Sequence, residues 1–439
     1  MPFQLDPTFA QDPAKHFDTL QIHAGLEPDP TTGAAALPIY ASAAFQFDSA
    51  PDAAAKFALS KPGNVYGRLT NTTTDAVAAR VAAIEGATGA VAVASGHAAE
   101  ILALTNIVGA GDHIVASDSL YGGTWNIFLH TLGDLGVETT FVENNDIDAF
   151  VAATKENTKL WYVETIGNPL VDVADVPAIV EAANSLKEPV PVFVDNTFAT
   201  PYLYRPADDG AAVVIESLTK WIGGHGATLG GAVIDTGKFD WKKTPGKFPT
   251  LTEPDPSYHG LVFADAAPAA PFSTRVLANK LRDFGPTLSP YAAQLIGIGI
   301  ETLSLRAQRH SDNALAVAKY LESHPKVSWV RYSGLENDPS HEVASRILHN
   351  GFGGVVVFGV KGGCDAGLKV VDNVKLFTHL ANVGDAKSLI IHPASTTHSQ
   401  LTPEQLKAAH LTEDLIRLSV GIENVDDIIA DLDQALENA

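Results

Sequence analysis

Sulfur-containing residues are almost missing from this chain of 439 residues. It has one cysteine, Cys364, and one methionine, the initial Met1. A single cysteine excludes an internal disulfide and any zinc site built from several thiolates. Because no motif described below includes Cys364, we expect it to have no part in the chemistry of the protein.

Basic residues and long apolar runs are also scarce. The chain carries 29 lysines and arginines against 51 acidic residues, and its net charge is −22. Such a charge disfavours general affinity for nucleic acid or for anionic membranes. No apolar run reaches the length of a membrane span, and the first residues lack the basic start of a signal peptide. We therefore expect a soluble, cytoplasmic protein with no nucleic-acid or membrane partner.

Several common ligand-binding motifs are absent from the sequence. There is no G-x-x-x-x-G-K-[ST], since each Gly-Lys pair precedes a phenylalanine, Phe239 or Phe248. No G-x-G-x-x-G follows an apolar run, so a dinucleotide site is not expected. His392 and His398 lack the H-E-x-x-H spacing and a third ligand, and we predict no metal site.

The chain does contain a series of short apolar runs, each followed by polar or glycine residues. Near-continuous runs of valine, isoleucine and alanine are typical of strands buried on both faces of a parallel sheet. Helical patterns lie between them, as over Thr74–Ile84 and Val176–Ser185. This alternation predicts an α/β fold with a mainly parallel sheet. The predicted strands are Ala90–Ala94, His113–Ala116, Leu160–Val163, Val190–Val194, Ala211–Ile215 and Gly231–Ile234.

The remaining sequence divides around this sheet. We predict a large domain over residues 63–287, in which 238–271 form a loop insertion rich in proline, lysine and aromatic residues. Residues 1–62 have little periodicity and are predicted to form an arm that packs on another subunit. A smaller α+β domain over 288–439 is indicated by one long helix, two strands and a terminal helix, at Pro290–Ser323, Gly354–Val360, Ile416–Val420 and Val425–Glu437.

The stretch ESLTKWIGGHG, Glu216 to Gly226, places Lys220 just after a predicted buried strand. One interpretation is a Schiff-base lysine that holds an aldehyde cofactor, because a desolvated amine is neutral and nucleophilic. Another is the S-x-x-K of a serine acyl-transferase with Ser217 as nucleophile, and S-D-N at Ser311–Asn313 matches that class. That interpretation is weaker, since no K-T-G follows and the S-D-N lies in a helical pattern. A third is an ordinary surface lysine.

Ligands of parallel α/β sheets gather beyond the carboxyl ends of the strands, which makes the polar residues there the candidates for a site. These residues are Ser95, Asp118, Glu164, Asp195 and Ser217. Pyridoxal phosphate needs an amine, an anion for its ring nitrogen, a face for its ring and a cradle for its phosphate. Asp195 can supply the anion, and the helix start at Ser95 can bind phosphate through backbone N–H groups.

Other residues near strand ends can complete such a site. Tyr121 offers a ring face, Ser217 and Thr219 offer hydroxyls for a phosphate, and Asn168 can bond the ring hydroxyl. Arg417, on a predicted strand, can clamp a substrate carboxylate through two hydrogen bonds. Each residue alone has a simpler interpretation as a cap, a turn or a surface ion pair. Their coincidence at the ends of one sheet favours pyridoxal phosphate.

These stretches together resemble the Cys/Met-metabolism family of pyridoxal-phosphate enzymes. The resemblance runs from about Phe17 to the C-terminus and rests on the motifs YGRLTNTTT, VASGHAAE, SLYGGT, VETIGNPL, VFVDNTFATP, SLTKWIGGHG, SLIIHPASTTHSQL and RLSVGIE. The insertion 238–271, with its DPSYHGL, is similar to that of the family branch that acts on O-acetylhomoserine. The resemblance implies an aspartate-aminotransferase-like fold (PLP fold type I) and a homotetramer of two active dimers.

The resemblance also implies a role for each motif residue. Lys220 would carry the cofactor and act as the catalytic base, and Tyr121 would stack on the ring and take part in catalysis. Asp195 would pair with the ring nitrogen and Asn168 would approach the ring hydroxyl. The phosphate would be held by Gly96, His97, Ser217 and Thr219, and by Tyr66 and Arg68 of the neighbouring subunit. The substrate would be bound by Arg417, Ser388 and Tyr66.

The implied activity is that of a transferase of methionine biosynthesis. Sulfide or a small thiol would replace the acetate of O-acetyl-L-homoserine and give L-homocysteine or methionine. A cystathionine γ-synthase or a methionine γ-lyase activity stays open as an alternative. Three positions depart from the family pattern, since Thr72 replaces a proline, His97 replaces glutamine or methionine, and Gly123 stands near the place of a lyase cysteine. The last departure argues against a γ-lyase.

Overall fold

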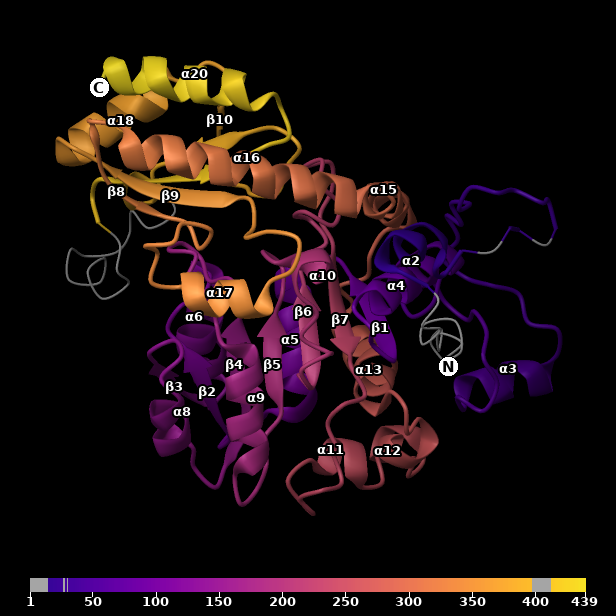
Figure 1. The fold of residues 1–439 in the computed structure, drawn as a ribbon. Helices are drawn as coiled ribbons and strands as arrows, with labels where there is room; N and C mark the ends of the chain where they lie inside the picture. Colours follow the sequence, from indigo (N-terminus) through magenta and orange to yellow (C-terminus); the bar gives the residue numbers. More distant parts are fainter. Residues whose placement is uncertain (1–14, 27, 30, 397–411) are drawn as a thin grey trace.

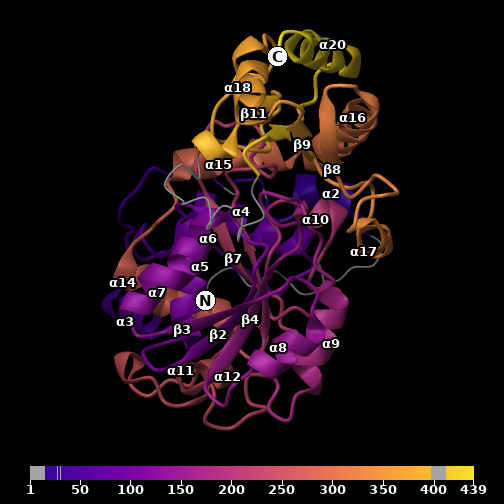
Figure 2. The same ribbon diagram turned by 90° about the vertical axis from the view of Figure 1, so that its left-hand side faces the viewer.

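The structure is a computed structural model that describes residues 15–26, 28–29, 31–396 and 412–439. It consists of a large α/β part with a smaller domain at one end, and Figures 1 and 2 show the C-terminal elements gathered above the large sheet. None of the helices in the described ranges is long and apolar enough to cross a membrane.

The large part is built on a seven-stranded sheet with the order β1-β7-β6-β5-β4-β2-β3. Strands β2 to β6 run parallel, whereas β7 is antiparallel to both of its neighbours, β1 and β6. The predicted mainly parallel sheet is therefore confirmed. The strands are β1 Gly89–Val93, β2 His113–Ser117, β3 Glu138–Val142, β4 Thr158–Glu164, β5 Val192–Asp195, β6 Val213–Glu216 and β7 Gly231–Asp235.

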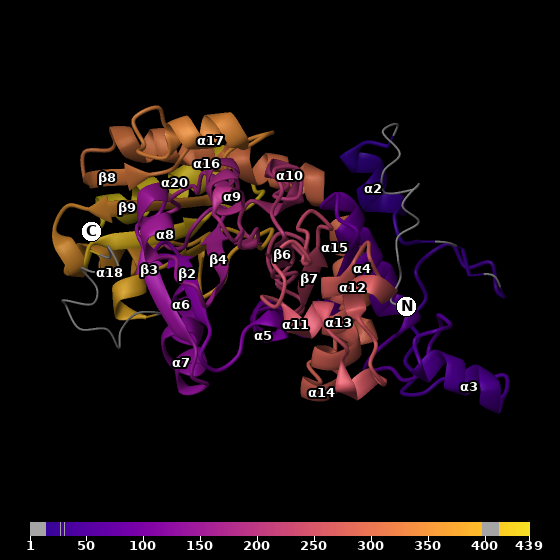
Figure 3. The same cartoon turned by 90° about the horizontal axis from the view of Figure 1, so that it is seen from below.

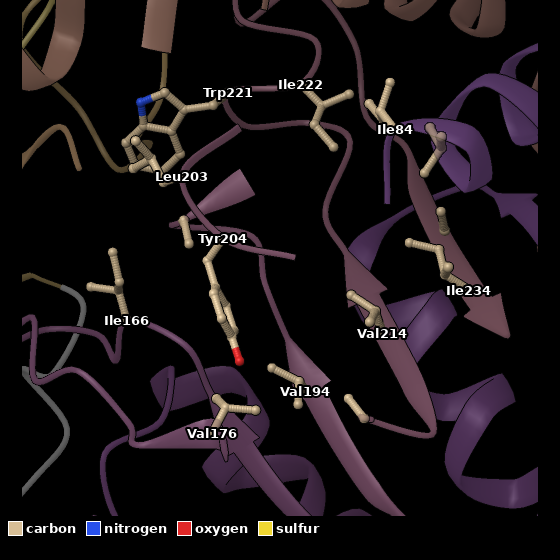
Figure 4. Packing of buried hydrophobic residues seen from close by; sticks show 14 of the residues in the cluster. Ile84, Ile166, Val176, Val194, Leu203, Tyr204, Val214, Trp221, Ile222 and Ile234 are labelled. Atoms are coloured by element: carbon tan, nitrogen blue, oxygen red, sulfur yellow. The ribbon is translucent and has the colours of Figure 1, made fainter. Parts of the chain in front are cut away.

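Alternate residues of the central strands face two separate cores, as the two-residue period of a strand requires. Val194, Val214 and Ile234 belong to one core, which Figure 4 shows from close by. Phe193 and Val213 belong to the other core, on the opposite face of the sheet. Because both faces of the sheet are covered, the sequences of these strands are continuous apolar runs. Polar residues occur at the ends of these runs.

Several helices of the large part cover these two faces. The predicted helices begin and end close to their expected bounds, with capping side chains at their starts: Asn71 accepts the N–H of Thr73, and Ser95 accepts the N–H of Ala98. The helices are α2 Phe17–His23, α3 Ala50–Phe57, α4 Thr72–Ile84, α5 Gly96–Ile107, α6 Gly122–Asn126, α7 Leu132–Asp134, α8 Ile147–Ala153, α9 Val176–Ser185, α10 Thr200–Leu203, α13 Pro271–Arg275 and α14 Arg282–Phe284, with π-helical turns η1 Ile127–Thr131 and η3 Val276–Leu281.

The insertion 238–271 is less irregular than expected. It contains the short helices α11 Pro249–Thr252 and α12 Phe263–Ala266 and the 3₁₀ turn η2 Pro256–Tyr258. Its aromatic residues anchor it, since the ring of Trp241 stacks on Phe272 with 5.2 Å between the centroids. Helix α3 projects away from both sheets, as Figure 3 shows from below.

The smaller domain has a five-stranded sheet with the order β10-β11-β12-β9-β8. The long helix predicted over 290–323 is two helices, α15 and α16, separated at Glu301 and Thr302. α15 packs against α4 of the large part, and the domain boundary at 287/288 stays a prediction. The elements are α15 Pro290–Ile300, α16 Leu303–Ser323, β8 Val327–Arg331, α17 His341–Ile347, β9 Val355–Val360, α18 Gly363–Asn373, β10 Thr378–His379, β11 Leu389–Ile391, η4 Pro393–Ser395, β12 Leu415–Ser419 and α20 Val425–Glu437.

Period-two alternation also orients β12. Ile416 and Leu418 pack under α16, α18 and α20, the helices on the far side of the small sheet. Leu415 joins a core of the large part instead. Arg417 therefore lies on the strand face that is turned towards the large domain.

Candidate active site

A cavity of about 270 Å³ lies where the carboxyl ends of the large sheet meet the small domain. The turns after β1, β2, β4, β5 and β6 form one wall, and β12 with residues 381–383 forms the other. The lining residues are Ser95, Gly96, His97, Glu100, Tyr121, Thr124, Glu164, Ile166, Asn168, Asp195, Thr197, Phe198, Ser217, Thr219, Lys220, Leu229, Ala381, Asn382, Val383 and Arg417.

Lys220 enters this cavity from the turn after β6. Its Nζ donates a hydrogen bond to Oδ1 of Asn382 at 2.6 Å. Burial and the nearby charge of Arg417 lower the pKa of Lys220 to about 8. The amine is thus close to the neutral state that nucleophilic attack on an aldehyde requires. The turn itself is fixed by Arg306, which donates to the carbonyl oxygens of Trp221 at 2.6 Å and Ile222 at 3.2 Å.

Carboxyl groups line the cavity on the side of β4 and β5. Asp195 ends β5, and its Oδ1 accepts the backbone N–H of Thr197 at 2.9 Å. Burial raises the pKa values of Asp195, Glu100 and Glu164, and the charge of Asp195 raises those of the two glutamates further. One oxygen of Glu100 is buried without a hydrogen-bond partner among the described residues. A cation in this cavity, such as a protonated ring nitrogen, would stabilise the ionised form of these buried carboxyl groups.

The start of α5 forms a cradle for an anion. The Ser95 hydroxyl caps Ala98, and the N–H groups of Gly96 and His97 at the first turn have no intrahelical acceptor. A Cβ at position 96 would lie 2.8 Å from Cβ of Ser217, so only glycine lets the two segments approach this closely. The amine, the carboxylate and the cradle fit an aldehyde, a ring nitrogen and a phosphate on one small molecule.

The residues expected to contact the ring and the substrate are also in the cavity. The backbone N–H of Tyr121 donates to Oε1 of Glu164 at 2.6 Å, while 47% of the tyrosine stays exposed. Arg417 donates to Oδ1 of Asn168 at 2.8 Å. It has no acidic partner among the described residues, and burial lowers its pKa to about 10. A buried guanidinium without a carboxylate is a site for the carboxylate of a substrate.

Comparison with known proteins decides the family. The sequence model of the family described as "Cys/Met metabolism PLP-dependent enzyme" matches residues 18–437. The chain belongs to this family. It is therefore an enzyme that uses pyridoxal phosphate, and the two sheets have the arrangement of PLP fold type I.

Its relatives match over nearly their whole lengths. A homocysteine synthase of Schizosaccharomyces pombe is 50% identical, with 97% of this chain and 99% of the relative covered. An O-acetyl-L-homoserine sulfhydrylase of Leptospira meyeri is 48% identical, with 96% of each chain covered. A crystal structure of an O-acetylhomoserine (thiol)-lyase from Campylobacter jejuni, which contains a pyridoxyl-lysine, has a TM-score of 0.92 and 39% identity over 96% of this chain and 100% of that one.

The expected phosphate ligands Tyr66 and Arg68 lie outside the cavity of their own chain. Tyr66 is 44% exposed, and the Arg68 guanidinium lies 5.5 Å from the centre of its ring. Arg68 also donates to the carbonyl oxygen of Arg282. Their expected contribution to the cavity of a neighbouring subunit stays a prediction.

Ser388 is not among the residues that line the cavity: it is buried, and its hydroxyl donates to Oε2 of Glu423 at 2.9 Å and accepts the N–H of Gly421 at 2.9 Å. Its expected contact with the substrate stays a prediction. Asn382, six residues earlier, lines the cavity and was missed because no motif marks it. The histidine His398 of the same motif lies outside the described residues, whereas His392 bonds Ser395 and the carbonyl oxygen of Glu413.

The S-D-N of the acyl-transferase interpretation is not in the cavity. Ser311 lies on α16, as its helical pattern indicated, and its hydroxyl accepts the backbone N–H of Phe352 at 2.8 Å. Ser217 instead stands at the cradle of α5. The interpretation of Lys220 as part of a serine acyl-transferase therefore lacks its partner residue.

Proposed function

We propose that this enzyme catalyses γ-replacement on O-acetyl-L-homoserine. Sulfide or a small thiol replaces acetate, and the products are L-homocysteine or methionine together with acetate. Several relatives that match nearly the whole chain are named for this chemistry. The observation that carries the proposal is the presence of Lys220, Asn382 and Arg417 in one cavity beside the carboxylate of Asp195. The enzyme is proposed to act in the cytoplasm as a homotetramer.

Each residue has a task that follows from its position. When bound, pyridoxal phosphate supplies the electron sink that makes the carbons of the substrate acidic. Lys220 anchors the cofactor and then moves protons at the substrate carbons, for which an amine with a pKa of about 8 is well suited. Asp195 keeps the ring nitrogen protonated. Arg417 binds the substrate carboxylate, and Asn382 can form a hydrogen bond to the substrate. Together they orient the substrate so that its reacting carbon faces Lys220.

A substrate panel tests the proposal. The purified holoenzyme is given O-acetyl-, O-succinyl- and O-phospho-L-homoserine, each with sulfide, methanethiol or L-cysteine, and the amino-acid products are separated by chromatography. We expect O-acetyl-L-homoserine with sulfide to give the highest kcat/KM. Preference for L-cysteine would indicate a cystathionine γ-synthase. Formation of a keto acid and ammonia without any thiol would indicate a γ-lyase.

The arrangement of Tyr66 and Arg68 supports a site shared between two subunits. We expect Arg68→Ala to weaken cofactor retention, because a charged phosphate ligand is lost. Mixing this variant with inactive Lys220→Ala should restore about a quarter of wild-type activity, since half of the randomly mixed dimers are hybrids with one complete site each. Hybrids are isolated with two different affinity tags. If verified hybrids have no activity, the site is not shared in this way.

A further inference from the structure

His97 is the one imidazole among the residues that line the cavity. It is the second residue of α5, and its side chain is exposed towards the cavity. Neither ring nitrogen has a hydrogen-bond partner among the described residues. The expected phosphate contact of this residue uses only its backbone N–H, so the side chain has no task in the site as described above.

Gly123 makes room for this imidazole. A Cβ at position 123 would lie 2.5 Å from both Cε1 and Nε2 of His97, and 2.5 Å from Cε1 of Tyr121. The Nε2 edge of His97 therefore rests over Gly123. The ring centroids of His97 and Tyr121 are 5.4 Å apart, with 36° between the planes. The imidazole is thus held beside the tyrosine in the wall of the cavity.

The imidazole of His97 is also able to accept a proton. The surrounding protein atoms and the positive charge of Lys220 both lower its pKa, so the imidazole is neutral above that pKa and can accept a proton. The other ionisable groups of the cavity are less suited, since Glu100 and Glu164 are buried acids and Arg417 stays charged. Lys220, Tyr121 and Asp195 already serve the cofactor and the substrate carbons.

We propose that His97 is a further catalytic residue, whose Nε2 accepts the proton that the sulfur donor loses when it bonds to the substrate. This inference rests on the proposed function. The S–H bond of the donor breaks and its electron pair stays on sulfur, which forms the new bond to the γ-carbon. Acetate departs with the electron pair of its C–O bond, and the proton resides on His97. The charges of acetate and imidazolium balance, and a thiolate is the reactive species because the neutral thiol is a poor nucleophile.

Two thiols of similar size and different acidity test this role in the holoenzyme. Ethanethiol is mostly neutral at pH 8.5, whereas 2,2,2-trifluoroethanethiol is mostly ionised and has little need of a base. For His97→Gln we expect kcat/KM to fall about 100-fold with ethanethiol, the usual scale for a lost general base. It should stay nearly unchanged with the fluorinated thiol. Equal losses with both thiols, or no loss with either, would overturn the proposal.

Control variants separate this role from a structural one. His130→Gln, at an exposed position of η1, should behave as the wild type with both thiols. The visible absorbance band and the cofactor content of His97→Gln should match those of the wild type. If the wild type uses neither of these thiols nor sulfide, the proposed function fails and the role of His97 fails with it.

A measurement that does not depend on turnover gives a second check. The imidazole proton resonance of His97, assigned by its loss in His97→Gln, is followed by NMR as a function of pH. We expect it to titrate below the ordinary histidine pKa of about 6.5. An imidazole that is still protonated at the assay pH could not accept the proton, and this result would also overturn the proposal.

Discussion

Lys220→Ala should abolish the visible absorbance band of the lysine-bound cofactor and lower kcat by about 10⁴-fold or more, because one amine is both the anchor and the base. The fold should survive. Among the described residues, Nζ makes its one hydrogen bond to Asn382, and the turn is held separately by Arg306. Absorbance spectra, steady-state kinetics and far-UV circular dichroism measure the three outcomes.

A lysine outside the cavity provides the control for this variant. Lys242, in the insertion, pairs with Asp265 on the surface, and Lys242→Ala should leave both band and kcat unchanged. Should Lys220→Ala keep its visible band, the assignment of the anchoring residue would be wrong.

Asp195→Asn should keep the fold and the bound cofactor but lower kcat by about 10²- to 10⁴-fold. An asparagine oxygen can still accept the N–H of Thr197, so the local geometry is retained. A neutral amide cannot keep the ring nitrogen protonated, and the electron sink is weakened. Kinetics and the position of the visible absorbance maximum measure the effect.

Glu100→Gln is the matched comparison for this substitution. Burial and the charge of Asp195 raise the pKa of Glu100 well above its ordinary value, which favours the neutral form of this side chain, and glutamine has nearly its shape. We expect a small effect on kcat. If Glu100→Gln loses more activity than Asp195→Asn, Glu100 and not Asp195 is the partner of the ring nitrogen.

The large sheet was predictable to the extent that its strands are buried on both faces. β3 was missed because it lies at the sheet edge, where Glu138 and the two threonines after it are partly exposed and break the apolar pattern. The antiparallel direction of β7 was not predictable, since the apolar pattern of a strand is the same in both directions. The break between α15 and α16 was not predicted, because Glu301 and Thr302 interrupt the helix and neither of them is a glycine or a proline.

The site was predictable where its residues follow strands of one sheet. Asp195 and Lys220 come directly after buried runs, and the fold brings such positions together. The contribution of the small domain was harder to predict. Arg417 was found from its place on a strand, but Asn382 lies in a segment without periodicity and was not predicted. Only the tertiary structure shows that the hydroxyl of Ser388 donates a hydrogen bond to Glu423.

The two hydrogen bonds that cross the cavity, Lys220 to Asn382 and Arg417 to Asn168, have a consequence for the energetics of the whole chain. A ligand that contacts residues of both the large and the small domain binds only the state in which the two sheets are docked. Its binding free energy is therefore added to the stability of that docked state. Occupancy of the site thus protects backbone amides along β9 and β12 of the small domain against solvent exchange, although neither the cofactor nor the substrate touches most of them.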